Sequence, residues 1–244
     1  MSPAITLATA RRILSQLRHD HRTLGLIVGV PSLLMVLLRY IFDQPGMFDR
    51  VGPPLLGVFP LVIMFVVTSV ATLRERAGGT LERLMTMPLG KLDLLLGYAL
   101  AFGLVALLQV GVVLAISLTW LGLEPAGSVG LLVAAAVLSA LLGVALGLLA
   151  SAFARTEFQA VQLMPAFVLP QALLCGLFVP REQMAGWLEA ISTVMPLTYA
   201  VEAMQEVGRE PEMTGTLAVD IAVIAGCVLA ALVLGAATLR RRTP

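Results

Sequence analysis

The chain has 244 residues, of which 59% are hydrophobic and 13% are charged, and its mean hydropathy is +0.95. Soluble proteins carry about 25% charged residues, so this composition excludes a soluble domain. The net charge of +1 gives no reason to expect nucleic acid as a partner. We therefore expect an all-α membrane protein that forms a single domain over residues 1–244.

The first 22 residues predict a basic amphipathic helix. Apolar residues recur at helical spacing, and arginines follow on another face, at positions Arg11, Arg12, Arg18 and Arg22. Such a helix is suited to lying along an anionic membrane surface, so membrane lipids are expected partners. The alternative is an ordinary solvated helix face. The apolar run that follows is as long as a full span and has no cleavage pattern, so we do not expect a signal peptide.

Six long apolar stretches predict six transmembrane helices, at residues 23–42, 54–73, 94–121, 129–154, 158–179 and 216–239. Residues 43–53 are rich in glycine and proline and predict a loop. Gly143 and Gly147 form a small-xxx-small pair, a weak indication that another helix approaches closely. Asp220 is a lone acid near one end of the last span, where we expect it at the membrane interface.

A few polar side chains within the spans are candidates for lining a pathway, namely Arg39, Gln159, Gln162 and Gln171. Arg39 lies near the end of its span and can instead snorkel to the interface. The glutamines can instead bond neighbouring helices to one another. Both alternatives stay open at this stage.

Residues 180–215 are too polar to span a membrane. Apolar residues at helical spacing, interrupted by Pro196, predict two short interfacial helices that form an outer cap. The basic residues indicate which side this cap faces. Six spans put twelve basic residues on the side of the two termini, against three or four on the other side. The positive-inside rule therefore predicts cytoplasmic termini.

The stretch from Arg74 to Lys91 is a charged segment between two apolar runs, and it predicts a short cytoplasmic helix. Thr80 is a good N-cap, Glu82 suits the first turn, and Pro88 limits continuation. A helix of about two turns is unstable alone, so its apolar strip favours docking against another protein. A solvated loop is the alternative.

This segment resembles the cytoplasmic coupling segment of type-2 ABC exporter permeases. The likeness rests on Glu75, Arg76, Gly79, Thr80, Leu81, Glu82, Arg83, Leu84, Met85 and Pro88. A second match resembles that family's outer signature, with Gly176, Pro180, Trp187, Pro196, Tyr199 and Glu202. The chain is most similar to the daunorubicin-resistance subgroup. Cys175 and Gln205 depart from the family pattern, which weakens the transfer of outer-side roles.

The resemblance implies a transport subunit of the bacterial inner membrane, not an enzyme, that exports a lipophilic or amphipathic substrate such as a drug. It implies two permease copies, or a pair with a sister subunit, and two ATP-binding subunits that carry ATP and magnesium. Lys91 follows Gly90, but Met85 and Leu92 do not fit a phosphate-binding loop, so we expect this chain to bind no ATP. We also expect no metal site.

Three alternatives remain at this stage. The substrate could be a glycolipid or a polysaccharide, because permeases for these share the layout. A secondary transporter or channel would need no ATPase, but the spans lack paired acids for proton coupling. An intramembrane enzyme or an assembly factor is a third class, and no catalytic set supports the enzyme.

Overall fold

The computed structural model describes residues 3–42, 44, 46–78 and 90–238. This part of the chain forms nine α-helices and one short 3-10 helix, with no strand. The elements are α1 (Pro3–His19), α2 (His21–Ile41), α3 (Met47–Ala77), α5 (Lys91–Thr119), α6 (Val129–Ala150), α7 (Glu157–Leu174), η1 (Arg181–Gln183), α8 (Gly186–Ser192), α9 (Pro196–Arg209) and α10 (Gly215–Thr238).

Five of these helices are long and apolar enough to cross a membrane, namely α2, α3, α5, α6 and α10. The protein is therefore a multi-pass membrane protein. The sixth predicted span corresponds to α7, which has only 18 residues and includes three glutamines, a glutamate and two prolines. These residues lower its hydropathy, which is why length and composition alone do not mark it as a span.

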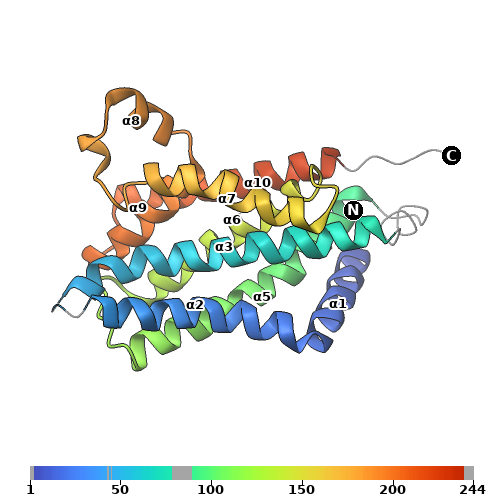
Figure 1. Cartoon of the computed structure of the whole chain (residues 1–244), viewed down its shortest axis with the longest axis horizontal. Coiled ribbons are helices and arrows are strands. Elements are labelled where there is room, and N and C mark those ends of the chain that lie inside the picture. The colour runs from blue at the N-terminus through green and yellow to red at the C-terminus, as the bar shows by residue number, and fades with distance from the viewer. Residues whose placement is uncertain (1–2, 43, 45, 79–89, 239–244) are drawn as a thin grey trace.

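The long helices run side by side along the bundle, while α1 lies across one end and α8 stands at the opposite end (Figure 1). Helix α3 is central and packs against α2, α6, α7 and α9. Its 31 residues extend about 46 Å at 1.5 Å per residue, more than the roughly 30 Å of a hydrocarbon core. At least one end of α3 therefore projects beyond the apolar layer.

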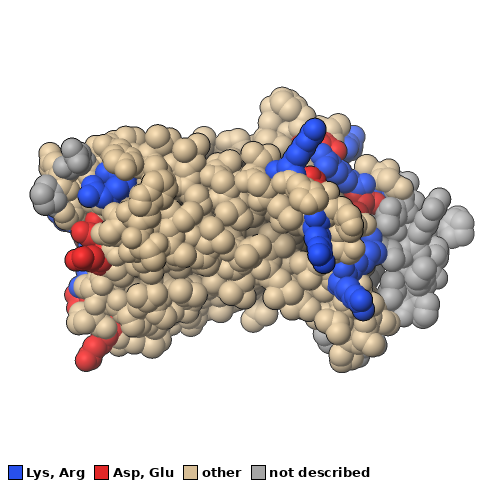
Figure 2. Space-filling model, turned by 90° about the horizontal axis from the view of Figure 1, so that it is seen from below, with Lys and Arg blue, Asp and Glu red and all other residues tan. Residues whose placement is uncertain are grey.

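On the face seen in Figure 2, charged side chains lie at the two ends of the molecule and leave a broad uncharged band between them, which we call the apolar band. Arginines gather at the end where α1 lies, which we call the basic end. The other end carries α8 and α9, and we call it the cap end. The band contains the exposed leucines, valines and phenylalanines of the long helices, as expected where lipid is the solvent.

The predicted loop at residues 43–53 is wrong in its second half, because α3 begins at Met47 and includes Pro53 and Pro54. A proline removes the hydrogen bond to the carbonyl four residues earlier. Here those carbonyls belong to Asp49 and Arg50, in the first turn of α3, near the end of the molecule. Their lost bonds cost little where water is close, so the helix continues through both prolines.

Two predicted spans also end earlier than expected. Helix α6 ends at Ala150 rather than at residue 154, and α7 ends at Leu174 rather than at residue 179. After α7 the backbone turns at Gly176, whose φ of +82° lies in the left-handed region that favours glycine. Residues 175–179 therefore lead to the cap instead of extending the span.

Helix α6 packs closely on α3 through the predicted glycine pair. A methyl group added at Gly143 would lie 2.2 Å from the carbonyl oxygen of Leu61, and one at Gly147 would lie 2.5 Å from that of Phe65. The two glycines and their two partners are each four residues apart, so both helices meet along one turn. This contact makes the small-xxx-small pair a packing surface within the chain.

Several polar residues are buried within this bundle, and Gln109 and Asp220 are two of them. Gln109 of α5 is fully buried and donates through Nε2 to the carbonyl of Ile27 in α2, at 2.9 Å. Asp220, near the start of α10, is only 3% exposed. Helix α10 packs against α6 and α9, and the interfacial depth of Asp220 stays a prediction.

Candidate functional site

The basic end of the bundle holds a polar cluster around Glu75, at the end of α3. Arg12 of α1 donates through both terminal nitrogens to the two carboxylate oxygens of Glu75, at 3.0 and 2.9 Å. Tyr98 of α5 donates its hydroxyl to the same carboxylate. Both charged side chains are partly buried, with 29% and 14% of their surface exposed. We call Arg12, Glu75 and Tyr98 the Glu75 cluster.

The Glu75 cluster depends on how α1 packs. Ala10 and Ile13 of α1 are buried, and α1 lies on α5. A methyl group added at Gly97 would come within 2.6 Å of the Cβ of Thr9, so only a glycine lets the two helices approach this closely. The close contact places Arg12 opposite Glu75. Arg12 is half-buried because it pairs with Glu75. The other three arginines predicted to face the membrane surface, Arg11, Arg18 and Arg22, are exposed.

A second ion pair joins the end of α3 to the start of α7. Arg74 donates through Nε and Nη2 to the two carboxylate oxygens of Glu157, at 2.8 and 2.9 Å. Both side chains are more than half exposed, so this pair contributes less than the Glu75 cluster. Consecutive residues of α3 therefore contact three other helices.

Helix α3 ends directly after these contacts, with Gly78 as its C-cap. The Nε of Arg76 is buried and has no hydrogen-bond partner within the described part of the chain. The remaining predicted coupling residues lie outside the described residues; they are Gly79, Thr80, Leu81, Glu82, Arg83, Leu84, Met85 and Pro88. Glu75 and Arg76 are thus the predicted coupling residues for which the structure gives geometry.

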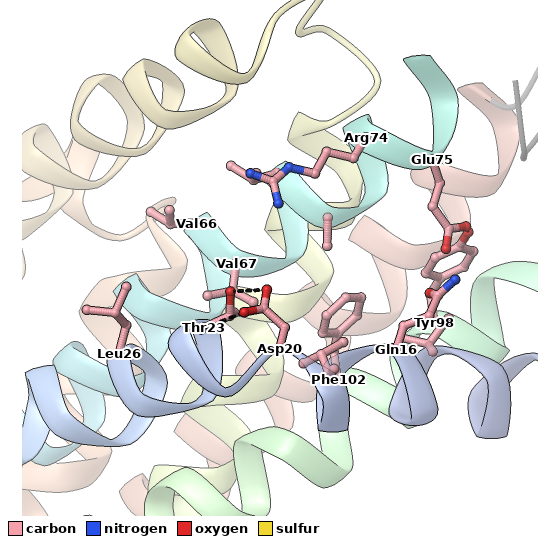
Figure 3. Close-up of a pocket in the computed structure, with 14 residues that line it drawn as sticks. Gln16, Asp20, Thr23, Leu26, Val66, Val67, Arg74, Glu75, Tyr98 and Phe102 are labelled. Atoms are coloured by element: carbon pink, nitrogen blue, oxygen red, sulfur yellow. Dashed lines mark hydrogen bonds between the residues drawn. The ribbon is translucent and has the colours of Figure 1, made fainter. Parts of the chain in front are cut away.

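A cavity of about 470 Å³ opens beside the Glu75 cluster, between α1, α2, α3 and α5 (Figure 3). Asp20, the N-cap of α2, lines it and accepts hydrogen bonds from the backbone N and the hydroxyl of Thr23, at 3.1 and 2.6 Å. These bonds hold the pKa of Asp20 below its usual value, so the carboxylate is ionised at neutral pH. Arg74 lines the same cavity.

The cap end contains its own polar set. Arg181 of η1 donates to Glu202 of α9 at 2.5 Å and to the hydroxyl of Ser192 in α8 at 2.9 Å. Burial opposes the charge of Arg181, but the hydrogen bond and charge of Glu202, together with the charges of Tyr199 and Glu189, outweigh burial and raise the arginine pKa. Tyr199 donates to the carbonyl of Thr193 at 2.6 Å. These bonds tie η1, α8 and α9 together.

The other predicted cap residues have separate places. Pro180 precedes η1, Pro196 begins α9, and Trp187 of α8 is 66% exposed. The two short helices on either side of Pro196 are confirmed as helices. Helix α9 nevertheless packs into the bundle against α3, α6 and α10. Its strong amphipathic pattern reflects burial in protein, because its apolar face meets other helices.

The four predicted pathway residues do not converge on one site. Gln171 is buried; its Oε1 accepts from the backbone N of Leu197 at 3.2 Å, which supplies a cap that the first turn of α9 otherwise lacks. Gln159 accepts from the backbone N of Arg155 at 2.8 Å, and Gln162 lines a shallow cavity beside it. Arg39 donates to the carbonyl of Leu121 at 3.1 Å. A role in a pathway stays a prediction for all four.

Sequence reasoning missed several residues that the structure joins. Tyr98, Gln109 and Arg181 each bond an element more than ten residues away in sequence. Tyr98 and Gln109 are conspicuous as polar groups inside a long apolar run, and this signal could have selected them. Arg181 gave no comparable signal, since a charged residue in a polar segment is ordinary.

Comparison with known proteins shows the family of the chain. Residues 3–207 match the family model for the ABC-2 type transporter, so the chain belongs to this family. The chain is 31% identical over 157 residues to a probable multidrug ABC transporter permease, YbhR of Escherichia coli K12. The aligned region covers 64% of this chain and 43% of the relative. The chain is 30% identical over 147 residues to the inner membrane transport permease YhhJ of the same organism, covering 60% and 39%.

A third relative is the linearmycin resistance permease protein LnrN of Bacillus subtilis 168. It is 26% identical over 158 residues, covering 65% of this chain and 40% of the relative. The chain therefore spans less than half the length of each of these three relatives. The predicted membership of the type-2 ABC family is confirmed, whereas the comparisons do not separate out the daunorubicin-like subgroup.

Proposed function

We propose that this chain is the membrane-spanning subunit of an ATP-driven exporter that moves a lipophilic or amphipathic substrate. Family membership supports the class of transporter. Relatives are named as multidrug and linearmycin resistance permeases, which favours a drug-like substrate. In this proposal the chain is not an enzyme, and ATP and magnesium bind to separate ATP-binding subunits. Two permease copies pair above two of these subunits.

The observation that carries the proposal is the Glu75 cluster. It joins α1, α3 and α5 directly before residues 79–89, the segment that resembles a coupling segment. Force applied to that segment reaches α3, which ends just before it, and α5, which begins just after it at Lys91. Because α3 is bonded to α1, α5 and α7 there, and packs on α6 and α9 further along, a displacement of its end moves much of the bundle.

We further propose that α7 is the sixth span. Its first residue, Glu157, pairs with Arg74 at the basic end, and Gln171 near its last turn bonds to α9 at the cap end. The helix therefore runs the length of the bundle, although its hydropathy is modest. Six crossings bring the start of α1 and the end of α10 to one side, as their positions at one end of Figure 1 suggest. The positive-inside rule makes that side cytoplasmic, with the protein in the inner membrane.

The test is capture of the ATPase. The chain is co-expressed with a candidate ABC ATP-binding subunit, and co-purification, ATP hydrolysis and efflux are measured. Leu84→Glu places a charge on the predicted docking strip, so we expect loss of the ATPase subunit and of efflux, with normal membrane insertion. The matched control is Met213→Glu, at an exposed apolar residue of the polar segment between α9 and α10, at the cap end. Full efflux by Leu84→Glu would contradict the proposal.

A further inference from the structure

The cavity beside the Glu75 cluster combines an apolar wall with a charged mouth. Its wall is formed by Leu26 of α2, Val66, Val67 and Val70 of α3, and Phe102 of α5. Its mouth carries Asp20 from the α1–α2 elbow and Arg74 from α3, which lie on opposite sides in Figure 3. A volume of about 470 Å³ falls within the roughly 300–1,000 Å³ range of small-molecule sites.

The two charged groups keep capacity for a ligand. A carboxylate offers about four acceptor positions, and Asp20 uses one on each oxygen for Thr23. A guanidinium has five donors, and the bonds of Arg74 to Glu157 use Nε and Nη2. Asp20 and Arg74 carry opposite charges at one opening, and each favours the charged form of the other.

The depth of the cavity matches the depth of a lipid headgroup and the start of its acyl chains. Asp20 precedes α2, and Arg74 lies in the last turn of α3, both at the basic end. Leu26 and Val67 lie six and seven residues further into the bundle, about 10 Å along each helix. The charged mouth therefore sits at the edge of the apolar band and the apolar wall sits inside it.

We propose that this cavity binds a membrane phospholipid with a zwitterionic headgroup that carries a primary ammonium. The phosphate contacts Arg74, the ammonium contacts Asp20, and an acyl chain lies along Leu26 and Val67. An anionic headgroup fits less well because the Asp20 carboxylate lies at the mouth, and a lipophilic cation fits less well because Arg74 does. The proposal rests on α2 and α3 as spans and not on the proposed transport activity.

The experiment uses the purified full chain in mild detergent. It is incubated with equal amounts of phosphatidylethanolamine and phosphatidylglycerol with identical acyl chains, and native mass spectrometry measures the lipid that stays bound. We expect phosphatidylethanolamine to be retained in preference. Asp20→Asn should reduce that preference about tenfold, the usual effect of losing one charge-assisted hydrogen bond. Asparagine caps a helix as well as aspartate does, so α2 should stay intact.

Further variants separate the headgroup from the chain. Arg74→Gln should weaken binding of both lipids because both carry a phosphate, and Val67→Trp should do so by filling the cavity. His21→Gln is the control, since His21 is exposed at the same elbow and does not line the cavity. Equal or tighter binding of phosphatidylglycerol by the wild type would overturn the proposal, as would an unchanged preference in Asp20→Asn. Displacement of phosphatidylethanolamine by tetraphenylphosphonium at equal concentration would assign the cavity to lipophilic cations instead. If Val67→Trp does not fold, Asp20→Asn decides the matter.

Discussion

Glu75 holds three helices together through one carboxylate. Arg12 and Tyr98 both donate to this carboxylate, and the side chains of Arg12 and Glu75 are mostly buried. Removing the charge from one partner of such a pair leaves the other charge without compensation, which costs more than the pair itself contributes. The carboxylate is therefore the residue at which the docking of α1 on α3 can be tested.

We predict that Glu75→Gln loosens α1 and destabilises the fold by about 1–3 kcal/mol, since Arg12 loses its charged acceptor. Hydrogen exchange in α1 and the thermal midpoint measure this effect. The matched control is Glu157→Gln, which breaks an exposed pair and should cost less than about 1 kcal/mol. If hydrogen exchange in α1 were equally slow in Glu75→Gln and Glu157→Gln, the Glu75 cluster would not hold that helix.

Gln171 provides a second test for single residues. Its carbonyl oxygen accepts from the backbone N of Leu197, in the first turn of α9. We predict that Gln171→Leu lowers stability by about 1–2 kcal/mol, the usual cost of losing a helix cap and burying an unpaired N–H. Gln162→Leu, at an exposed position, should leave the thermal midpoint unchanged. A large loss of efflux in Gln171→Leu without any loss of stability would instead support its predicted role in a pathway.

Among whole elements, the contact between α3 and α6 leaves the least room for an added methyl group, at Gly143. We predict that Gly143→Ala destabilises the bundle by about 1–3 kcal/mol, because the added methyl group meets the backbone of α3 and not a flexible side chain. Gly111→Ala in α5 is the control, since nothing lies within 4 Å of a methyl group there. The difference in thermal midpoint between the two variants measures the contact. Equal stability would mean that the helices can separate at no cost.

The elements also show how far sequence patterns extend. The apolar stretches located every long helix, and the predicted bounds of α2 and α10 differ from those of the structure by at most two residues. The start of α3 was missed because proline and glycine usually indicate loops in sequence, whereas a membrane helix tolerates them. The amphipathic pattern of α9 was ascribed to a membrane surface because a buried face and a lipid-facing face have the same period.

For the whole molecule, the distribution of charge makes a testable statement about orientation. We predict that Ser15→Cys, in α1, is protected from a membrane-impermeant thiol reagent in intact cells, whereas Thr193→Cys, between α8 and α9, is labelled. Both positions are exposed, and both single-cysteine variants start from a chain in which Cys175 and Cys227 are replaced by alanine. After the cells are opened, both should be labelled. Labelling of Ser15→Cys in intact cells would contradict cytoplasmic termini.

The sequence by itself determined that the chain is a helical membrane protein, where its long helices lie, and to which transporter family it belongs. Hydropathy, periodicity and motif order are local properties, so they can be read without knowing which helices touch. Only the tertiary structure decided that Arg12 pairs with Glu75, 63 residues away, and that Gln171 caps α9. A long polar side chain can reach many partners from one position, and the packing of the helices selects one of them.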